Sequence, residues 1–338
     1  MTNETLIHSN FVKRDEPFEA KLRPETLDAF LGQKSVCDRL EVMICAAKQR
    51  KEVLGHCLFS GPPGLGKTTL AMILAKAMGS QLVTTSGPLV EKPGDLAGLL
   101  TNLQRGDVLF IDEIHRMNRA VEEYLYSAME DFVLDLMIDS GPAARSVQLK
   151  LSPFTLVGAT TRVGLLTAPL RSRFLCACRL EYYKSDVLVS IVRRTADLLG
   201  MQIDVQSAEE VAGRCRGTPR IANNLLRFVR DFAQIKAEGK ADKCVVKDAL
   251  TLLGIDPLGL DVLDRKFLNV LVEHYEGGPV GLNTLATALG ESAHTLEEVH
   301  EPFLVQKGLI KRTPRGREIT LLGHKHWEKS RKEKAETV

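Results

Sequence analysis

The sequence of 338 residues lacks the features that mark several whole classes of protein. No apolar run approaches the roughly 20 residues of a membrane-spanning helix, so we expect no membrane segment. The first 18 residues contain no apolar core of the kind that a secretory signal needs. No repeat period is present. With 44% hydrophobic and 26% charged residues, the composition is ordinary for a soluble globular protein, and the length suggests two or three domains.

The chain also lacks a C-x-x-C pair, although it contains seven cysteines. An odd number of cysteines without a disulfide framework fits a reducing compartment, so we expect a cytoplasmic protein. Cys176 and Cys178 are one residue apart, which favours two thiols on the same face of a strand over a metal site. The net charge is only +2, so a surface for nucleic acid would have to be local.

Among the features that are present, the segment Gly61–Thr69 (GPPGLGKTT) is the most informative. Its spacing is that of a loop that binds the phosphates of a nucleoside triphosphate. Glycines in such a loop let backbone N–H groups approach phosphate oxygens without a Cβ atom in the way. Lys67 is placed to reach the β- and γ-phosphates, and the Thr68 hydroxyl to bind magnesium. A strand at His56–Ser60 and a helix at Thr69–Met78 supply the context that the motif requires.

A second half of the site is predicted where the buried strand DVLFIDE ends at Glu113. Four apolar residues in a row suit a central parallel strand. We expect Asp112 to hold magnesium through its water shell and Glu113 to orient and deprotonate the attacking water. The later strand TLVGATT ends in hydroxyl residues, and Thr160 or Thr161 could hold the same water or the γ-phosphate. An ordinary turn after that strand is the alternative interpretation.

Two further segments place arginines at the starts of helices. The first, PLRSRF, carries Arg171 and Arg173, and phosphoryl transfer gains greatly from an arginine supplied by a neighbouring subunit. The second, GTPR, ends at Arg220 and has proline at a favoured first-turn position. An arginine there can point at a phosphate from a second domain. Solvated surface arginines are the alternative in both cases.

The pattern predicts an α/β fold, a parallel sheet covered by helices on both faces, followed by a helical domain and a winged-helix domain. Strands are expected at 57–60, 82–85, 108–112, 155–159 and 178–181. We predict a flexible N-terminus at 1–18, a large ATPase domain at 19–183, a small helical domain at 184–254, a winged-helix domain at 257–323 and a charged, frayed tail at 324–338.

The winged-helix prediction comes from two helices, Leu282–Leu289 and Thr295–Gln306, followed by a basic ribbon. Five bases in this ribbon have no acid between them, Lys307, Lys311, Arg312, Arg315 and Arg317. A solvated basic loop is the alternative to a DNA contact. Because few Asn or Gln residues accompany the arginines, we expect phosphate contacts with little sequence preference.

The order of these elements resembles the AAA+ ATPases. Several stretches are not shared by AAA+ proteins in general and resemble the RuvB family, the bacterial Holliday-junction branch-migration motors. These stretches are LRPETLDAFLGQ from Leu22, LFIDEIHR from Leu109, GPAARS from Gly141, GATTR from Gly158, RGTPRIAN from Arg216, GGPVG from Gly277 and QKGLIKRTPRGR from Gln306. The resemblance covers residues from about 20 to 320.

The resemblance implies roles for residues that match the family's motifs, with ATP and Mg²⁺ as cofactors. Arg173 would act as an arginine finger in trans, and Arg220 would sense the phosphate from the second domain. The catalytic set would be Glu113, Lys67, Arg173 and Thr161, and the metal would lie at Thr68 and Asp112. The ATP-binding set would be Leu22, Arg23, Gly64, Leu65, Gly66, Lys67, Thr68, Thr69, Glu130, Asp131, Phe132, Arg173, Tyr183 and Arg220, and the DNA-binding set Arg312 and Arg317.

The resemblance also implies a function and partners. The chain would form a hexameric ring that drives duplex DNA through Holliday junctions, with RuvA docked on a hairpin at Asp135–Leu149 and the nuclease RuvC in the full complex. An ATP-controlled DNA-binding switch of the initiator or clamp-loader type is the alternative. A protein unfoldase would need an aromatic pore loop, and no convincing one is present.

Two positions depart from the family's usual pattern. Ser172 stands beside the finger where the family has an acid, which puts the orientation of Arg171 and Arg173 in question. Ala293 and His294 stand near the start of the predicted DNA helix, where an arginine is common in the family, so we expect one DNA contact to be weaker.

Overall fold

The computed structural model describes residues 21–137 and 146–335. The chain divides into two compact units. The first contains the residues up to Leu199 together with Gly217–Ile221, and the second contains Gly200–Arg216 together with the residues from Ala222 onward. The predicted flexible N-terminus, 1–18, lies outside the described residues, and the predicted boundaries between the small helical and winged-helix domains stay predictions.

The first unit is built on a parallel sheet with the order β2-β3-β6-β1-β7. Its strands are β1 (Cys57–Ser60), β2 (Leu82–Ser86), β3 (Val108–Asp112), β6 (Thr155–Thr160) and β7 (Cys176–Arg179). The first four agree with the predicted strands to within one residue. The prediction of 178–181 for the last strand was wrong by two residues, because Cys176 and Cys178 alternate with outward-facing neighbours and pair with β1, whereas Glu181 binds Gln33.

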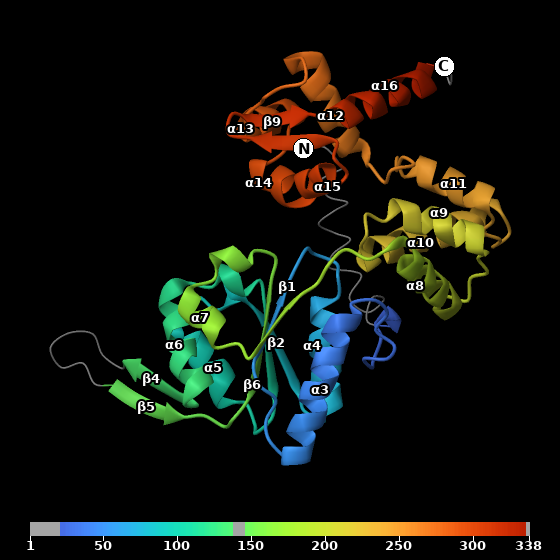
Figure 1. The fold of residues 1–338 in the computed structure, drawn as a ribbon. Coiled ribbons are helices and arrows are strands. Elements are labelled where there is room, and N and C mark those ends of the chain that lie inside the picture. Colours follow the sequence, from blue (N-terminus) through green and yellow to red (C-terminus); the bar gives the residue numbers. More distant parts are fainter. Residues whose placement is uncertain (1–20, 138–145, 336–338) are drawn as a thin grey trace. The chain divides into compact units, whose positions relative to one another are not determined.

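Helices cover both faces of this sheet, as Figure 1 shows. On one face lie α3 (Lys34–Arg50) and α4 (Lys67–Met78), and on the other α5 (Pro93–Thr101), α6 (Arg119–Glu130) and the short α7 (Ala168–Ser172). The 3-10 turns η1 (Gly87–Leu89), η2 (Ile114–Arg116) and η3 (Val163–Leu165) connect these elements, and α8 (Ser185–Leu198) follows β7. The predicted fold class, a parallel sheet between two layers of helices, is confirmed.

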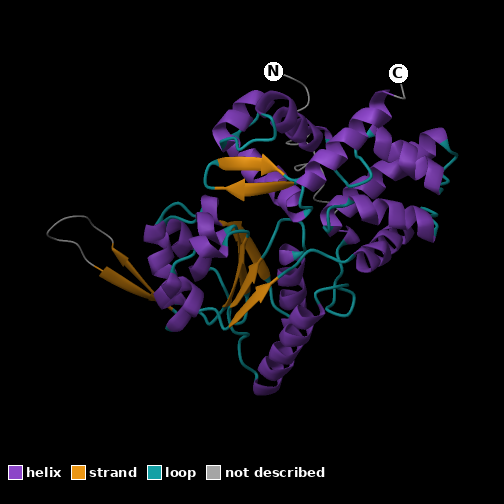
Figure 2. Cartoon of the chain, turned by 45° about the horizontal axis from the view of Figure 1, so that its top comes forward, coloured by secondary structure: helices purple, strands orange, loops and turns teal. Residues whose placement is uncertain are grey.

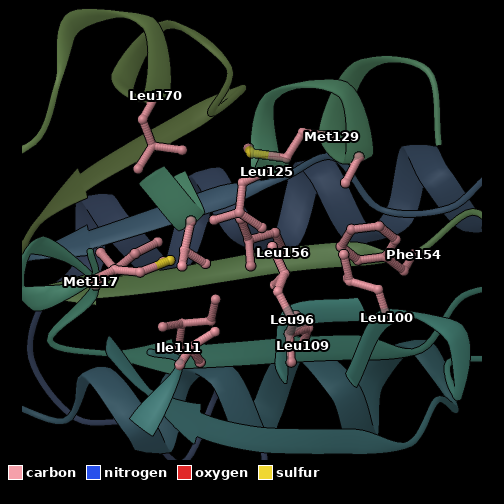
Figure 3. Packing of buried hydrophobic residues seen from close by; sticks show 14 of the residues in the cluster. Leu96, Leu100, Leu109, Ile111, Met117, Leu125, Met129, Phe154, Leu156 and Leu170 are labelled. Atoms are coloured by element: carbon pink, nitrogen blue, oxygen red, sulfur yellow. The ribbon is translucent and has the colours of Figure 1, made fainter. Parts of the chain in front are cut away.

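An apolar core fixes the strands that carry the site. The side chains of Leu109, Ile111 and Leu156 point from β3 and β6 toward Leu125 on α6 and are fully buried (Figure 3). Burying one such side chain stabilises the fold by about 1.5–3 kcal/mol. Because Leu109 and Ile111 are two residues apart on β3, they share one face of the sheet, and their packing also sets which residues reach the carboxyl end of this strand.

A two-stranded hairpin extends from the first unit beside α6 (Figures 1 and 2). It consists of β4 (Val133–Met137) and β5 (Ser146–Lys150), which pair antiparallel. Gln148 donates to Asp135 at 3.0 Å across the pair. The two strands of the predicted hairpin are therefore confirmed. Its predicted turn, 139–142, lies outside the described residues.

The second unit contains the helical segment and the winged helix. Its helices are α9 (Val205–Arg214), α10 (Pro219–Lys236, whose first residues belong to the first unit), α11 (Lys243–Leu252), α12 (Val262–Tyr275), α13 (Leu282–Leu289), α14 (Ala293–Thr295) and α15 (Glu301–Gln306), with a π-helical turn at Leu296–His300 and a final helix, α16 (Leu321–Ala335). Strands β8 (Ile310–Thr313) and β9 (Gly316–Ile319) form the predicted ribbon. The helix predicted at Thr295–Gln306 is continuous but contains the π turn.

The C-terminal tail is helical up to Ala335, whereas we predicted a frayed segment from residue 324. Two polar contacts hold the start of α16. Trp327 donates to Asn269 at 2.6 Å, and His326 contacts Asp256 at 2.8 Å. The charge of the tail suggested solvation, but these two residues attach one side of the helix to the unit. Among the described helices, none is long and apolar enough to cross a membrane.

A buried ionic network ties the helical segment to the winged helix within the second unit. Arg216, which has a left-handed φ of 56°, donates to Asp261 at 2.8 Å and to Asp264 at 2.6 Å at the start of α12. His300 Nδ1 lies 2.8 Å from the fully buried Asp264. Burial opposes the charging of His300, but the hydrogen bond to Asp264 and the charges of Asp264 and Asp261 outweigh it, so the pKa of His300 is raised.

The network predicts a pH-dependent contribution to stability. A histidine whose folded-state pKa is raised stabilises the fold fully below its unfolded pKa of about 6.5 and loses that contribution as the pH rises through the folded value. We therefore expect His300→Gln to lower the urea midpoint more at about pH 6 than at about pH 9. An equal loss at both pH values would contradict the assignment.

Candidate functional site

The phosphate-binding loop links β1 to α4 and depends on its glycines. Gly64 and Gly66 have φ of 78° and 98°, a left-handed region that favours glycine. A Cβ atom on Gly66 would lie 2.8 Å from the ring of Phe30, and one on Gly61 would lie 2.5 Å from the carbonyl oxygen of Leu180. Gly66 is also the N-cap of α4, so the loop runs directly into the positive end of the helix dipole.

Lys67 is the first residue of α4 and is buried. Its Nζ donates to the carbonyl oxygens of Gly61 at 2.8 Å and Pro62 at 2.9 Å, so the side chain folds back over the loop. Burial lowers the pKa of Lys67, while the charges of Glu113 and Asp112 act in the opposite direction. The loop thus holds a cation close to two carboxylates, with Thr68 and Thr69 in the same helical turn.

The two predicted carboxylates stand at the end of β3. Burial and the neighbouring Glu113 charge raise the pKa of Asp112. Glu113 has a left-handed φ of 46°, and its carboxylate accepts from the Thr161 hydroxyl at 3.1 Å. His115 Nδ1 lies 3.1 Å from the same carboxylate and 2.9 Å from the Thr160 hydroxyl. The prediction left open whether Thr160 or Thr161 acts in the site; both reach this cluster, and Thr161 contacts Glu113 directly.

Residues from beyond the sheet also reach the loop within the first unit. The backbone N–H of Arg220 donates to the carbonyl oxygen of Gly64 at 3.4 Å, and the charge of Arg220 acts on both Lys67 and Asp112. The hydroxyl of Tyr183 donates to the carbonyl oxygen of Leu65 at 3.1 Å, and burial raises the pKa of Tyr183 well above its usual range. Both predicted residues therefore meet the loop.

Leu22 and Arg23, which were predicted to bind the nucleotide near its base, differ in exposure, since Arg23 is half-buried. Leu22 is buried, and Arg23 donates to the sulfur of Met72 on α4 at 3.3 Å. Arg23 also lines a cavity of about 250 Å³ together with Pro24, Glu25, Met72, Ile73 and Lys76. The role of Leu22 and Arg23 beside the nucleotide base stays a prediction.

The predicted arginine finger belongs to a separate cluster on α6 and α7. Arg173 donates to the carbonyl oxygen of Pro169 at 2.8 Å and to Glu130 at 2.9 Å, and its guanidinium lies 4.6 Å from the centre of the Tyr126 ring. Its Nε is buried and has no hydrogen-bond partner among the described residues. Ser172 donates to the carbonyl of Pro169 at 2.9 Å, so the departure from the family pattern leaves Arg173 anchored through that shared carbonyl.

Asp131 and Phe132 follow Glu130 directly, after the end of α6. Phe132 packs against His56 and Phe154 and has a left-handed φ of 53°. Glu130, Asp131 and Phe132 are therefore consecutive in the chain, and Glu130 pairs with Arg173.

The basic ribbon is more internally paired than the sequence suggested. Glu301 on α15 is fully buried, and Arg317 on β9 contacts it through Nε at 3.0 Å and through Nη2 at 2.9 Å. Arg312 on β8 also pairs with Glu301. The Arg317 side chain is 17% exposed and that of Arg312 is 51% exposed. Of the two predicted DNA contacts, Arg312 is therefore the one presented to solvent.

Sequence reasoning missed two residues of these sites. His115 was quoted within a motif but given no role, although it follows Glu113 by two residues at the end of the strand. Glu301 was likewise given no role, although it lies within the helix predicted at Thr295–Gln306. Glu301 precedes the buried Leu304 by three residues, a helical spacing, but the π-helical turn at Leu296–His300 is what brings it to the buried side, and the sequence does not indicate that turn.

Comparison with known proteins identifies a family for each part of the chain. Family descriptions match in three consecutive ranges: "Holliday junction DNA helicase RuvB P-loop domain" at 22–180, "RuvB AAA lid domain" at 183–256 and "RuvB C-terminal winged helix domain" at 257–328.

Similar proteins carry the same name. The chain is 63% identical over 324 residues to the Holliday junction branch migration complex subunit RuvB of Protochlamydia amoebophila, which covers 96% of this chain and 98% of the relative. It is 58% identical to the subunit of that name in Flavobacterium psychrophilum, over 96% of each chain. A solved structure of the Thermotoga maritima RuvB Holliday junction branch migration motor is 50% identical, with a TM-score of 0.82 over 91% of this chain and 98% of that chain. The chain belongs to the RuvB family of P-loop ATPases.

Proposed function

We propose that this chain is the ATP-hydrolysing motor of a Holliday junction branch migration complex, working as a hexameric ring on duplex DNA. The observation that carries the proposal is the Glu113 cluster at the end of β3, held by Thr161 and His115 beside the phosphate loop. Family membership over nearly the whole chain supports the branch-migration part. The test is ATP-driven migration of a synthetic four-way junction with and without RuvA, and no movement in either case would contradict it.

The residues at the loop fit a magnesium–nucleotide complex. Mg²⁺ prefers oxygen ligands, and the Thr68 hydroxyl and Asp112 carboxylate would hold it, directly or through water. The metal would neutralise charge that develops on the phosphates. Lys67 and the backbone N–H groups of Gly64, Leu65 and Gly66 would hold the phosphates, and the rest of the predicted ATP-binding set, including Leu22, Arg23, Tyr183 and Arg220, would surround the nucleotide.

Glu113 is placed to act as general base. Thr161 and His115 fix the direction of its carboxylate, which would accept a proton from the attacking water. The short distances leave the carboxylate little freedom, so water and base would be pre-positioned before the reaction begins.

A neighbouring subunit would complete the site. In the cluster on α6 and α7, Arg173 pairs with Glu130, which Asp131 and Phe132 follow in the chain, and the described polar contacts of its side chain are with Pro169 and Glu130. We propose that this cluster faces the nucleotide of the next subunit and that Arg173 stabilises the charge of the transferring phosphoryl group there.

DNA and protein partners follow from the same proposal. The ribbon of β8 and β9 would contact DNA phosphates, chiefly through Arg312. The hairpin Asp135–Leu149 would dock RuvA, with RuvC joining the full complex, and a cytoplasmic location is part of the proposal.

An ATP-controlled DNA-binding switch is the alternative function, and it would share the ATP site and the ribbon. The junction assay separates the two functions because a switch would not move the branch point.

Replacing the proposed base should stop turnover without stopping binding. Glu113→Gln should bind ATP but hydrolyse it about 10²–10⁴-fold more slowly, because the lost proton acceptor contributes about that factor. Single-turnover hydrolysis and nucleotide binding measure the two effects. Glu123→Gln, on the exposed side of α6, is the matched control and should keep normal turnover. Normal hydrolysis by the Glu113 variant would remove this residue from its role.

Mixing two inactive variants tests the trans arrangement. Arg173→Ala should bind nucleotide yet hydrolyse little, and Lys67→Ala should lack nucleotide binding. In a mixed ring some sites combine an intact Lys67 with an intact Arg173 from the neighbour, so turnover should partly recover. Steady-state hydrolysis over a range of mixing ratios measures this. A mixture that stays as inactive as its parts would argue against the finger in trans.

Replacing the two arginines of the ribbon should have different effects, one on DNA binding and the other on stability. Arg312→Ala should weaken duplex binding for all sequences and reduce the salt-dependence slope by about one. Arg317→Ala should chiefly destabilise the winged helix, because breaking a buried pair costs about 3–5 kcal/mol and Arg312 compensates Glu301 only in part. Fluorescence anisotropy over a salt series and urea unfolding measure these effects.

The double variant Arg317→Met with Glu301→Gln is the control for the ribbon. It removes the buried charge together with its partner, so much of the lost stability should return. An Arg317→Ala protein with unchanged stability and a reduced salt slope would instead make Arg317 a direct phosphate contact.

A further inference from the structure

Three thiols gather where the edge strand β7 pairs with β1. Cys57 on β1 stands opposite Cys176 on β7, and the sulfur atoms of Cys176 and Cys178 are 3.4 Å apart. Cys57 and Cys178 are fully buried, and Cys176 is 8% exposed. None of the three contacts the Glu113 cluster or the ribbon in the described polar contacts, so neither ATP hydrolysis nor DNA binding accounts for them.

The surroundings favour the charged form of one of these thiols. Cys176 lies 3.4 Å from the sulfur of Cys178 and opposite Cys57, and its interactions with these two thiols and with the charge of Arg39 on α3 lower the pKa of Cys176 despite its burial. The interaction with Cys176, together with burial, raises the pKa of Cys178 and of Cys57. A thiolate beside a cation and next to a second thiol has the surroundings of a redox-active cysteine, since the thiolate is the nucleophile.

The strand that carries this pair also borders the phosphate loop. The hydroxyl of Ser60 donates to the carbonyl oxygen of Cys178 at 3.3 Å, and the N–H of Leu180 donates to the carbonyl oxygen of Ser60 at 2.8 Å. The carbonyl oxygen of Leu180 in turn lies so close to Gly61 that a Cβ atom there would be only 2.5 Å from it. A change in the backbone path of β7 would therefore displace Gly61, the first residue of the phosphate loop.

We propose that Cys176 and Cys178 form a peroxide-sensitive pair whose oxidation to a disulfide reversibly impairs the adjacent phosphate loop. The Cys176 thiolate attacks a peroxide oxygen, the O–O bond breaks, and hydroxide leaves, so that Cys176 becomes a sulfenic acid. The Cys178 sulfur, losing its proton, then attacks the Cys176 sulfur, and the hydroxyl group leaves as water. Two thiols are oxidised by two electrons, and one peroxide is reduced to two waters when the peroxide is hydrogen peroxide.

The product would be strained and therefore reversible. Residues two apart on an extended strand have Cα atoms about 6.6 Å apart, near the upper limit of about 6.8 Å for a disulfide. Closing the bridge would require β7 to bend, and strained disulfides are reduced more readily than relaxed ones. As the edge strand of four residues, β7 can bend without breaking a ladder on its outer side.

The test treats the full-length protein with hydrogen peroxide and follows both chemistry and turnover. Trypsin leaves Cys176 and Cys178 in a single peptide, Phe174–Arg179, and leaves Cys57 in another. We expect that single peptide to lose two hydrogens, ATP turnover to fall in step, and dithiothreitol to restore both. The Cys178→Ser variant should keep its fold and resist this reversible loss.

The exposed thiols provide the matched control. Cys45 and Cys244 are exposed, so simple accessibility would make them react first. The double variant Cys45→Ser with Cys244→Ser should show the same disulfide and the same loss of turnover as the unaltered protein. The proposal is overturned by a peptide of unchanged mass, by a bridge that joins Cys57 to Cys176, or by full turnover in protein that carries the Cys176–Cys178 bridge. Cys178→Ala serves as a second variant if the serine form is unstable.

Discussion

The parallel register of three neighbouring strands is the constraint on which the site depends. Ser60 of β1 stands opposite Thr160 of β6, and Ile111 of β3 stands opposite Gly158 of the same strand. Parallel strands end at one edge of the sheet, so the phosphate loop, the carboxylates and the hydroxyl groups must meet there. The apolar packing beneath that edge holds the register, because a slip of one residue would turn each of these side chains to the other face.

Under the proposed function, the groups that meet at this edge are only part of a hydrolytic site. The loop, Glu113 and the Arg220 segment come together within one unit of one chain. Arg173 instead lies with Glu130 and the ring of Tyr126, in a cluster with its own contacts. Because these contacts already hold the Arg173 side chain in place, little conformational entropy would be lost in ordering it when a subunit interface forms. The phosphate loop and Glu113 lie in one cluster and Arg173 lies in another. This separation is the physical reason to expect that subunits assemble into a ring and that one subunit alone is not an active enzyme.

Motifs with a fixed local geometry were predictable from the sequence, and long-range pairings were not. The loop, the strand ending in Glu113 and the hydroxyl-tipped strand follow from glycine spacing and apolar runs. The position of β7 was wrong by two residues, because its ends depend on pairing with β1. Glu301 was missed because only the folded winged helix shows two arginines converging on one buried carboxylate. The fold of the tail likewise depended on Trp327 and His326 finding distant partners.

The central claim is that no single subunit completes the ATP site. The most direct measurement is ATP turnover per subunit over a wide range of protein concentrations, with the state of assembly followed by sedimentation in the same buffer. The account predicts that turnover per subunit falls on dilution in step with the loss of assembled rings and that monomers hydrolyse almost no ATP. Monomers that hydrolyse ATP as fast as the assembled protein would contradict it.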